Sequence, residues 1–212
     1  MDAQFWHQRW ESNRIGFHET GVSRALADHL GALSLPASAR IFLPLCGKTE
    51  SIGWLLSSGY RVVGAELSEL AVKQLFEELG IAANLMVSGS LEQYSADGLE
   101  IFVGDIFDLA ADTLGRVDAV FDRAALIALP EAMRGSYAAH VTAITRRAPQ
   151  LLVSLEYDQS LMQGPPFSVT GDEIGRHYRG DYHIAKLADG ALDGGVRELQ
   201  SVRETVWHLT PR

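Results

Sequence analysis

Glu66 directly follows residues 61–65, which are predicted to form a buried strand, and lies about 20 residues beyond a tight loop at residues 44–48. Pro44 cannot donate a hydrogen bond to a sheet, and Gly47 lets the backbone turn sharply or approach a ligand closely. In nucleotide-binding α/β folds, an acid at this distance from such a loop accepts hydrogen bonds from ribose hydroxyls. The spacing therefore predicts that Glu66 binds the ribose of a ligand held by the loop.

The loop lacks the features of the two common phosphate-binding loops. A dinucleotide site requires GxGxxG, whereas residues 44–48 contain one glycine. Gly47, Lys48 and Thr49 resemble the end of a P-loop, but that motif also requires a glycine five residues before Gly47, where this chain has Phe42. These mismatches favour an adenosine-type ligand with little or no phosphate, and S-adenosylmethionine fits that description.

The elements that position these residues alternate between strand and helix. Residues 41–43 are predicted to form a strand, and residues 50–57 a helix with apolar side chains on one face. A second strand over residues 61–65 leads to a helix over residues 69–79, with Ser68 as its N-cap and a glycine at its end. This alternation predicts a doubly wound α/β sheet with its ligand at the carboxyl ends of the strands.

The remainder of the chain continues this pattern. We expect strands over residues 101–103, 117–121 and 151–155, a helix over residues 130–146, and two final strands over residues 182–187 and 198–209. The final pair is predicted to be antiparallel because a loop rich in glycine and aspartate joins it. No repeat or linker interrupts the sequence, and its length suits one domain, residues 1–212.

Seven stretches of the chain are similar to a known family, the thiopurine S-methyltransferases, and they run through most of its length. These stretches are FWHQRW (5–10), IGFHE (15–19), LPLCGKTESIGWL (43–55), GYRVVGAELSELAV (59–72), VGDIFDL (103–109), FDRAALIALP (121–130) and YDQSLMQGPPFSV (157–169). PLCGK, in place of a glycine-rich loop, and DRAALIALP are highly specific signals. Thr49 and Glu50 stand where the family more often has Ser-Asp, which is a conservative difference.

The resemblance implies a doubly wound, seven-stranded, mostly parallel sheet of the class I S-adenosylmethionine-dependent methyltransferase type. Residues 1–35 would form an N-terminal helical lid segment, and residues 36–212 the sheet core. The resemblance also implies S-adenosyl-L-methionine as the cofactor, bound by Trp10, Leu45, Gly47, Glu66, Asp105, Ile106 and Arg123. Phe17 and Arg123 would contact the substrate, and the positive charge of Arg123 would make it the catalytic residue by favouring a thiolate or another anionic group.

Several of these residues also have plainer explanations. Glu66 could be a solvated carboxylate at a strand end. Asp105 could close a turn, and Ile106 could belong to the core. Arg123 could form an ion pair with Asp122 at the edge of the sheet, and this role is compatible with a catalytic one. The resemblance favours binding roles for Glu66 and for the pair Asp105 and Ile106.

The N-terminal segment carries large apolar side chains ahead of the first sheet strand. Trp6 and Trp10 are four residues apart, so a short helix would place both on one face. For Trp6 we favour a hydrophobic anchor to the core over a site role. The resemblance makes this segment a lid that would exclude water from the sulfonium and the thiol.

The composition restricts the remaining function classes. The net charge is −9 with scattered basic residues, which argues against nucleic-acid binding. The single cysteine, Cys46, excludes an internal disulfide framework, and we expect a small buried hydrophobe there rather than a nucleophile. Asp105, Asp108, Asp118 and Asp122 have turn or strand-end explanations, so no metal is expected. The absence of a signal peptide or membrane-spanning run predicts a cytoplasmic protein, and we expect a monomer.

The predicted reaction is direct displacement, in which an aromatic or heterocyclic thiolate attacks the sulfonium methyl of S-adenosylmethionine. The sequence shows no strong candidate for a general base, and a lowered thiol pKa would make one unnecessary. Two alternatives remain open. One is methylation of selenium or tellurium oxyanions, or of another small chalcogen compound, on the same fold; the other is a non-catalytic protein that binds S-adenosylmethionine.

Overall fold

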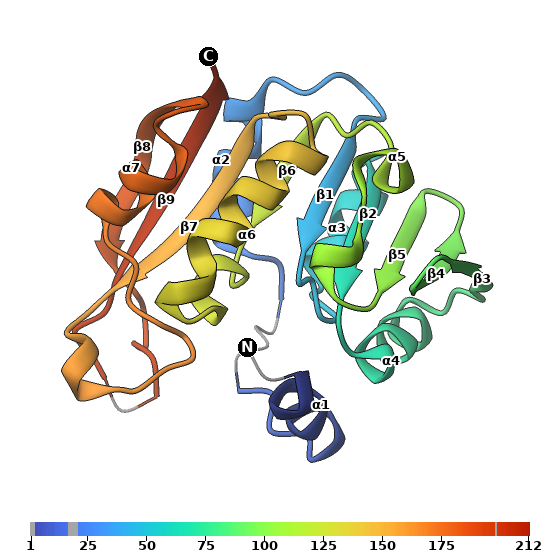
Figure 1. Cartoon of the computed structure of the whole chain (residues 1–212), viewed down its shortest axis with the longest axis horizontal. Coiled ribbons are helices and arrows are strands. Elements are labelled where there is room, and N and C mark those ends of the chain that lie inside the picture. The colour runs from blue at the N-terminus through green and yellow to red at the C-terminus, as the bar shows by residue number, and fades with distance from the viewer. Residues whose placement is uncertain (1–2, 17–20, 198) are drawn as a thin grey trace.

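The structure is a computed structural model that describes residues 3–16, 21–197 and 199–212 (Figure 1). These residues form a sheet of nine strands in the order β3-β4-β5-β2-β1-β6-β7-β9-β8. The strands are β1 (Arg40–Pro44), β2 (Arg61–Glu66), β3 (Asn84–Ser88), β4 (Leu91–Ala96), β5 (Leu99–Val103), β6 (Ala119–Asp122), β7 (Gln150–Glu156), β8 (Tyr182–Ala191) and β9 (Arg203–Pro211). None of the described helices is long and apolar enough to cross a membrane.

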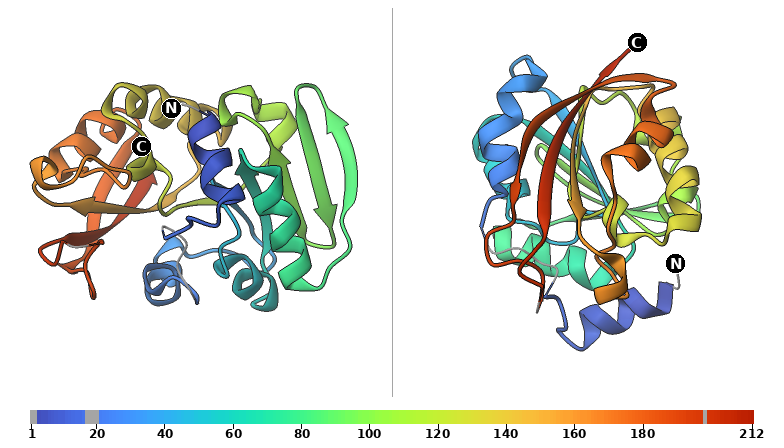
Figure 2. Two further views of the ribbon diagram at one scale, coloured as in Figure 1. Left: turned by 90° about the horizontal axis from the view of Figure 1, so that it is seen from below. Right: turned by 90° about the vertical axis from the view of Figure 1, so that its left-hand side faces the viewer.

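Helices cover both faces of the sheet, as the two views of Figure 2 show. The α-helices are α1 (Ala3–Glu11), α2 (Arg24–His29), α3 (Ser51–Ser57), α4 (Glu69–Leu79), α5 (Ala111–Leu114), α6 (Glu131–Ile144) and α7 (Gly171–Tyr178). The short 3-10 helices are η1 (Leu30–Leu33), η2 (Ile106–Asp108), η3 (Leu126–Ala128) and η4 (Gln159–Leu161). One apolar cluster includes buried side chains of α6 and α7, and the other includes those of α2, α3 and α4. Phe42 of β1 belongs to the first cluster, whereas its neighbours Ile41 and Leu43 belong to the second, as expected for a strand with helices on both faces.

The centre of the sheet is parallel, as predicted, but the number of strands is not seven. Strands β5, β2, β1, β6 and β7 pair in parallel, and β9 and β8 add to them as an antiparallel pair. These seven strands correspond to the predicted sheet. The hairpin β3–β4 adds two more beyond β5. It escaped prediction because β3 is exposed along nearly its whole length and therefore lacks the alternation of a half-buried strand.

Most predicted elements form, with shifted ends. Helix α4 matches its predicted range, and the Ser68 hydroxyl caps it by accepting a hydrogen bond from the amide of Ala71 at 3.4 Å. Helix α6 ends earlier than the predicted residue 146, because Arg146 and Arg147 have φ angles of 54° and 61° that a right-handed helix cannot include. Helix α7 was not predicted. Strand β9 begins at Arg203 rather than at the predicted position 198, which lies outside the described residues.

A buried ion pair joins α6 and α7 beside the carboxyl ends of the strands. Arg134 and Glu173 are 3% and 6% exposed, and one guanidinium nitrogen of Arg134 lies 2.8 and 2.9 Å from the two carboxylate oxygens. Arg134 also donates to the carbonyls of Leu129 and Ser168, and His177 lies 3.2 Å from Glu173. The pair therefore fixes the segment after η3 against the segment that leads into α7.

Replacing Arg134 with Met should lower the free energy of unfolding by about 3–5 kcal/mol, because Glu173 would stay buried without its partner. The double variant Arg134→Met/Glu173→Leu should lose less, because it leaves no unpaired charge. Urea unfolding would measure both values. Arg146→Met is the matched control, since the ion pair of Arg146 with Asp112 is exposed and should contribute little. Equal losses for the single and double variants would contradict this account.

Candidate functional site

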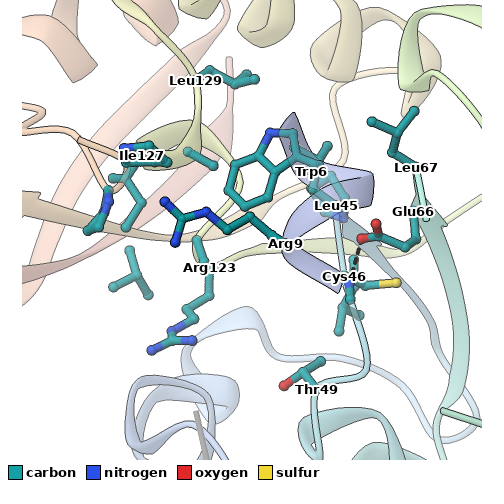
Figure 3. A pocket seen from close by; sticks show the side chains of 18 of the residues that line it. Trp6, Arg9, Leu45, Cys46, Thr49, Glu66, Leu67, Arg123, Ile127 and Leu129 are labelled. Atoms are coloured by element: carbon teal, nitrogen blue, oxygen red, sulfur yellow. Dashed lines mark hydrogen bonds between the residues drawn. The ribbon is translucent and has the colours of Figure 1, made fainter. Parts of the chain in front are cut away.

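A cavity of about 510 Å³ lies at the carboxyl ends of β1, β2, β5 and β6 and is bordered by α1 (Figure 3). Strand β1 lies between β2 and β6, and the chain builds outward from β1 through β2 to β5 before it crosses to β6, so the direction of the strand order reverses beside β1. Ligands of open α/β sheets bind at such switch points, in pockets of roughly 300–1,000 Å³. The lining residues that directly follow these strands are Leu45, Cys46, Gly47, Lys48, Leu67, Gly104, Asp105, Ile106, Phe107, Arg123 and Ala124.

The loop after β1 has an unusual backbone. Leu45 has a φ of 48° and Gly47 a φ of 54°, both in the left-handed region. For Leu45, which has a side chain, this conformation costs roughly 1–2 kcal/mol. The amide of Cys46 donates to the carbonyl of Ala65 at 3.0 Å, which ties the loop to β2. A β-carbon on Gly47 would lie 3.2 Å from the indole of Trp10, so a glycine there lets Trp10 approach the loop closely.

Glu66 ends β2 and is 7% exposed. Its Oε2 accepts a hydrogen bond from the amide of Gly47 at 2.8 Å, and its Oε1 accepts one from the amide of Ser68 at 2.9 Å. Burial raises the pKa of this carboxyl above its ordinary value, and the backbone amides partly offset that effect. Each carboxylate oxygen can accept more than one hydrogen bond, so Glu66 keeps acceptor capacity toward the cavity.

The loop after β5 is fixed by side chains on both sides. Oδ1 of Asp105 accepts a hydrogen bond from the amide of Phe107 at 3.0 Å, which is the turn role considered for this residue. His140 of α6 lies 2.8 Å from the carbonyl of Ile106 through its Nε2. Asp105 is exposed and Ile106 is buried, yet both line the cavity. The structural and the binding explanations are therefore compatible at these two positions.

Arg123 and Asp122 have different surroundings although they are adjacent. Asp122 is fully buried and accepts hydrogen bonds from the Tyr137 hydroxyl at 2.7 Å and the Leu126 amide at 3.2 Å. Burial raises the pKa of Asp122 to about 6, although the hydrogen bond from Tyr137 lowers it. Arg123 is half-buried and lines the cavity, and the following residue, Ala124, has a φ of 69°. Tyr137 and Leu126 thus hold Asp122 from the side of α6 and η3, while Arg123 borders the cavity.

Helix α1 contributes both of its tryptophans to the cavity. Trp10 is 4% exposed and packs beside the loop after β1. Trp6 also lines the cavity, with its indole facing the enclosed space in Figure 3. A lining position was not predicted for Trp6, which we had expected to anchor the helix to the core. The spacing of four residues predicts that Trp6 and Trp10 share one face of the helix, so a site position for Trp10 also indicates one for Trp6.

Charged side chains of both signs line the cavity: Arg9, Arg14, Lys48, Glu66, Asp105, Arg123, Asp193, Arg197 and Glu204. In Figure 3 the guanidinium groups of Arg9 and Arg123 lie on one side, and the carboxylate of Glu66 lies on the other. Arg9 was not predicted as a site residue. Its guanidinium carbon lies 4.8 Å from the ring centre of Phe5, which also borders the cavity. Positive charge is therefore available where Arg9 and Arg123 lie, and hydrogen-bond acceptors are available where Glu66 lies.

Another part of the cavity wall is largely apolar. Ile127 and Leu129 extend into it from the segment around η3, as Figure 3 shows. Pro165 and Pro166 belong to a segment distant in sequence that reaches the same wall, where the amide of Phe167 bonds to the carbonyl of Ile127 at 2.6 Å. An apolar wall excludes water and suits a flat ring. Sequence periodicity could not identify these residues because they lie in irregular segments.

Comparisons with known proteins agree with this geometry. A sequence profile of the family described as Thiopurine S-methyltransferase (TPMT) matches residues 1–212. The chain belongs to this family. A relative named Thiopurine S-methyltransferase from Xanthobacter autotrophicus is 50% identical over 210 residues, which cover 99% of each chain. Another relative with that name, from Acinetobacter baylyi, is 45% identical over 216 residues and covers 100% of each chain.

Solved structures of other methyltransferases share this fold. A SAM-dependent methyltransferase from Anabaena variabilis superposes with a TM-score of 0.68 at 15% identity, covering 99% of this chain and 95% of that one. The 1,6-didemethyltoxoflavin-N1-methyltransferase of Burkholderia thailandensis, with bound S-adenosylhomocysteine, has the same score and identity and covers 99% and 86%. The predicted class I methyltransferase fold is thus confirmed, with the hairpin β3–β4 as an addition.

The described residues assigned through the family resemblance gather at one cavity. Its lining includes seven of them: Trp10, Leu45, Gly47, Glu66, Asp105, Ile106 and Arg123. Phe17, the eighth, lies outside the described residues. Cys46 is 9% exposed, and burial raises its thiol pKa well above the ordinary value, which keeps it neutral. Among the described residues, no three histidine, cysteine or acidic side chains are grouped as metal ligands.

Proposed function

We propose that this protein transfers the methyl group of S-adenosylmethionine to the sulfur of aromatic or heterocyclic thiols, thiopurines among them. One observation carries the proposal. Residues from four strand ends and from α1, far apart in sequence, border the same cavity. That cavity combines hydrogen-bonding groups for a nucleoside with an apolar wall for a flat ring. The names of the relatives support the choice of thiopurines.

The cofactor fits the side of the cavity that contains Glu66. We assign the ribose hydroxyls to the Glu66 carboxylate, which two backbone amides already hold in position. The adenine would pack near Asp105 and Ile106, and the methionine part near the backbone of Leu45 and the indole of Trp10. The left-handed backbone at Leu45 supports this arrangement, because such strain is concentrated at ligand sites.

S-Adenosylmethionine supplies an electrophilic methyl group. The thiolate sulfur, its proton already lost to solvent, would bond to the methyl carbon as the bond from that carbon to the sulfonium sulfur breaks, so the products would be a methyl thioether and S-adenosylhomocysteine. The apolar wall and α1 hold the ring and exclude water, and well-oriented reactions gain roughly 7–11 kcal/mol from such positioning. Arg123 would lower the thiol pKa and so raise the thiolate fraction. The displacement requires neither a covalent enzyme intermediate nor a metal ion.

The remaining assignments complete the proposal. We place residues 1–212 in one catalytic domain, with residues 1–35 as the N-terminal helical lid segment and residues 36–212 as the sheet core. Within the lid segment, α1 borders the cavity, whereas α2 packs against the sheet. Phe17 would contact the substrate ring. The enzyme would act in the cytoplasm on a small molecule rather than on nucleic acid, and one chain would be the catalytic unit.

Incubation with S-adenosylmethionine labelled in the methyl group would test the proposal. Label should move to the sulfur of a thiopurine such as 6-mercaptopurine, and mass spectrometry should show the methyl thioether. Selenite and tellurite, offered separately, address the chalcogen alternative. Transfer only to these oxyanions would replace the proposed substrate class, and cofactor binding without any transfer would favour the non-catalytic alternative.

Glu66→Gln should weaken binding of S-adenosylmethionine by roughly 1–3 kcal/mol, because the ribose would lose a charged acceptor. Binding to the unmodified protein should also weaken as the pH falls through the raised pKa of Glu66, since only the ionised form accepts from both hydroxyls. Calorimetry at several pH values measures both effects. The Glu66→Gln variant serves as the control for pH, and a pH dependence that it retains would assign the titration to another group.

Arg123→Ala should lower kcat/KM and move the acidic limb of the pH profile upward, because loss of the positive charge raises the pKa of the bound thiol. Arg123→Lys should keep part of the activity. Comparing the pH profiles for two substrate thiols of different intrinsic pKa would identify the titrating group. If the acidic limb reflects ionisation of the thiol, it should shift with the pKa of the thiol. A limb that belongs to Asp122, whose pKa is about 6, would not. An unmoved limb with a lower melting temperature would assign Arg123 a structural role.

A further inference from the structure

The two edges of the sheet are built differently. At one edge, β8 contains an irregularity between Lys186 and Ala188 and carries Asp189, which pairs with both Lys186 and Arg203. Bulges and charged side chains are the usual devices by which natural proteins prevent an edge strand from pairing with another chain. At the other edge, β3 pairs with β4 in a regular register from Asn84 to Ser88 without any irregularity. That edge has none of these devices.

Strand β3 is also the most apolar exposed segment of the described chain. Leu85, Met86 and Val87 are 54%, 61% and 76% exposed, and they make up three of the five exposed large hydrophobic side chains among the described residues. Figure 1 and the left view of Figure 2 show β3 at the outer edge, with nothing beyond it. Residues 80–91 contain no charged side chain, in a chain that is 21% charged. An uncharged apolar edge is suited to pairing with another strand.

The hairpin determines which backbone groups of β3 face outward. Ser88 pairs with Leu91 across the two-residue loop, and a loop of this length is closed by a hydrogen-bonded pair. Hydrogen-bonded and non-hydrogen-bonded pairs alternate along an antiparallel ladder, so Met86 is bonded to β4 as well. The backbone N–H and C=O groups of Leu85 and Val87 therefore point away from β4, toward the open edge.

We propose that β3 pairs with β3 of a second copy of this chain, antiparallel and centred on Met86. In this register Leu85 of each copy faces Val87 of the other, and their outward backbone groups exchange hydrogen bonds. Met86 then faces Met86 of the second copy across the two-fold axis. An isologous contact of this kind requires a segment that is complementary to itself, and this five-residue strand meets that condition.

In this register the side chains of the two copies are also complementary. Leu85 and Val87 lie on the face that carries Tyr94 and Glu92 of β4, so two copies would place four aliphatic side chains in one patch. Met86 occupies the opposite face.

The distribution of charge favours contact between two copies through β3 over contact through other parts of the surface. Each chain has a formal net charge of −9, so most contacts between two copies would bring like charges together. Strand β3 and its turn avoid that cost because they carry no charge. The strand is short, so the contact should be weak and depend on concentration. The two catalytic cavities would remain separate, since no residue of β3 lines the cavity.

Sedimentation of the full chain tests association. The average mass should rise above the 23.2 kDa of one chain as the concentration increases from about 10 µM to about 500 µM. Val87→Lys should abolish the rise, because it places a charge at the edge. Leu161→Lys is the matched control, since Leu161 is 64% exposed but lies in η4. A constant mass for the unmodified chain, or equal loss in both variants, would overturn the proposal.

Disulfide cross-linking tests the register. Residues facing each other in a non-hydrogen-bonded pair have Cα atoms about 4.5 Å apart, within the range that a disulfide can bridge. Met86→Cys should therefore give a covalent dimer on mild oxidation. Val87→Cys is the control, because its two copies would lie roughly 9 Å apart along the paired strands. Cys46 is buried and should not contribute. Equal cross-linking at both positions would show unspecific contact and overturn the register.

Discussion

The carboxylate of Glu66 is the contact on which the rest of the site depends. One oxygen holds the amide of Gly47 and the other holds the amide of Ser68, so a single side chain joins the loop after β1 to the start of α4. Without this acceptor, two backbone donors at the end of the sheet would need other partners. The same group faces the cavity. Its structural role and its proposed role in binding ribose therefore share one side chain.

The hydrogen bonds of Glu66 help to explain how strained backbone conformations persist nearby. Leu45 and Ala124 both have φ angles in the left-handed region, at the ends of β1 and β6. Such conformations persist only where the surroundings hold them. For Leu45, those surroundings are the hydrogen bond of the next residue to β2, the amide contact with Glu66 and the indole of Trp10 against Gly47. The strained backbone is thus supported by a rigid parallel sheet on one side and by α1 on the other.

The sequence predicted those parts of the molecule that depend on local pattern. The loop at Gly47 and the acid at Glu66 were identified by spacing, and helix α4 by its cap and periodicity. The hairpin β3–β4 was missed because an exposed strand has no buried face to mark it. Arg134 was missed for a different reason: its partner Glu173 lies 39 residues away and on another helix. Pairings of that kind arise from tertiary packing, which periodicity in one sequence does not show.

The floor and the roof of the cavity are built from different elements. Its floor is formed by the ends of strands that are paired on both sides, whereas α1 has nine residues and one fully buried side chain, Trp10. An isolated helix of that length is not stable in water, so α1 depends on packing against the loop at Gly47. Any ligand that fills the space beside Trp6 and Trp10 adds apolar contacts to α1. If the N-terminal segment acts as the proposed lid, ligand binding would therefore stabilise α1 over the cavity, and α1 would have to move aside for ligand exchange.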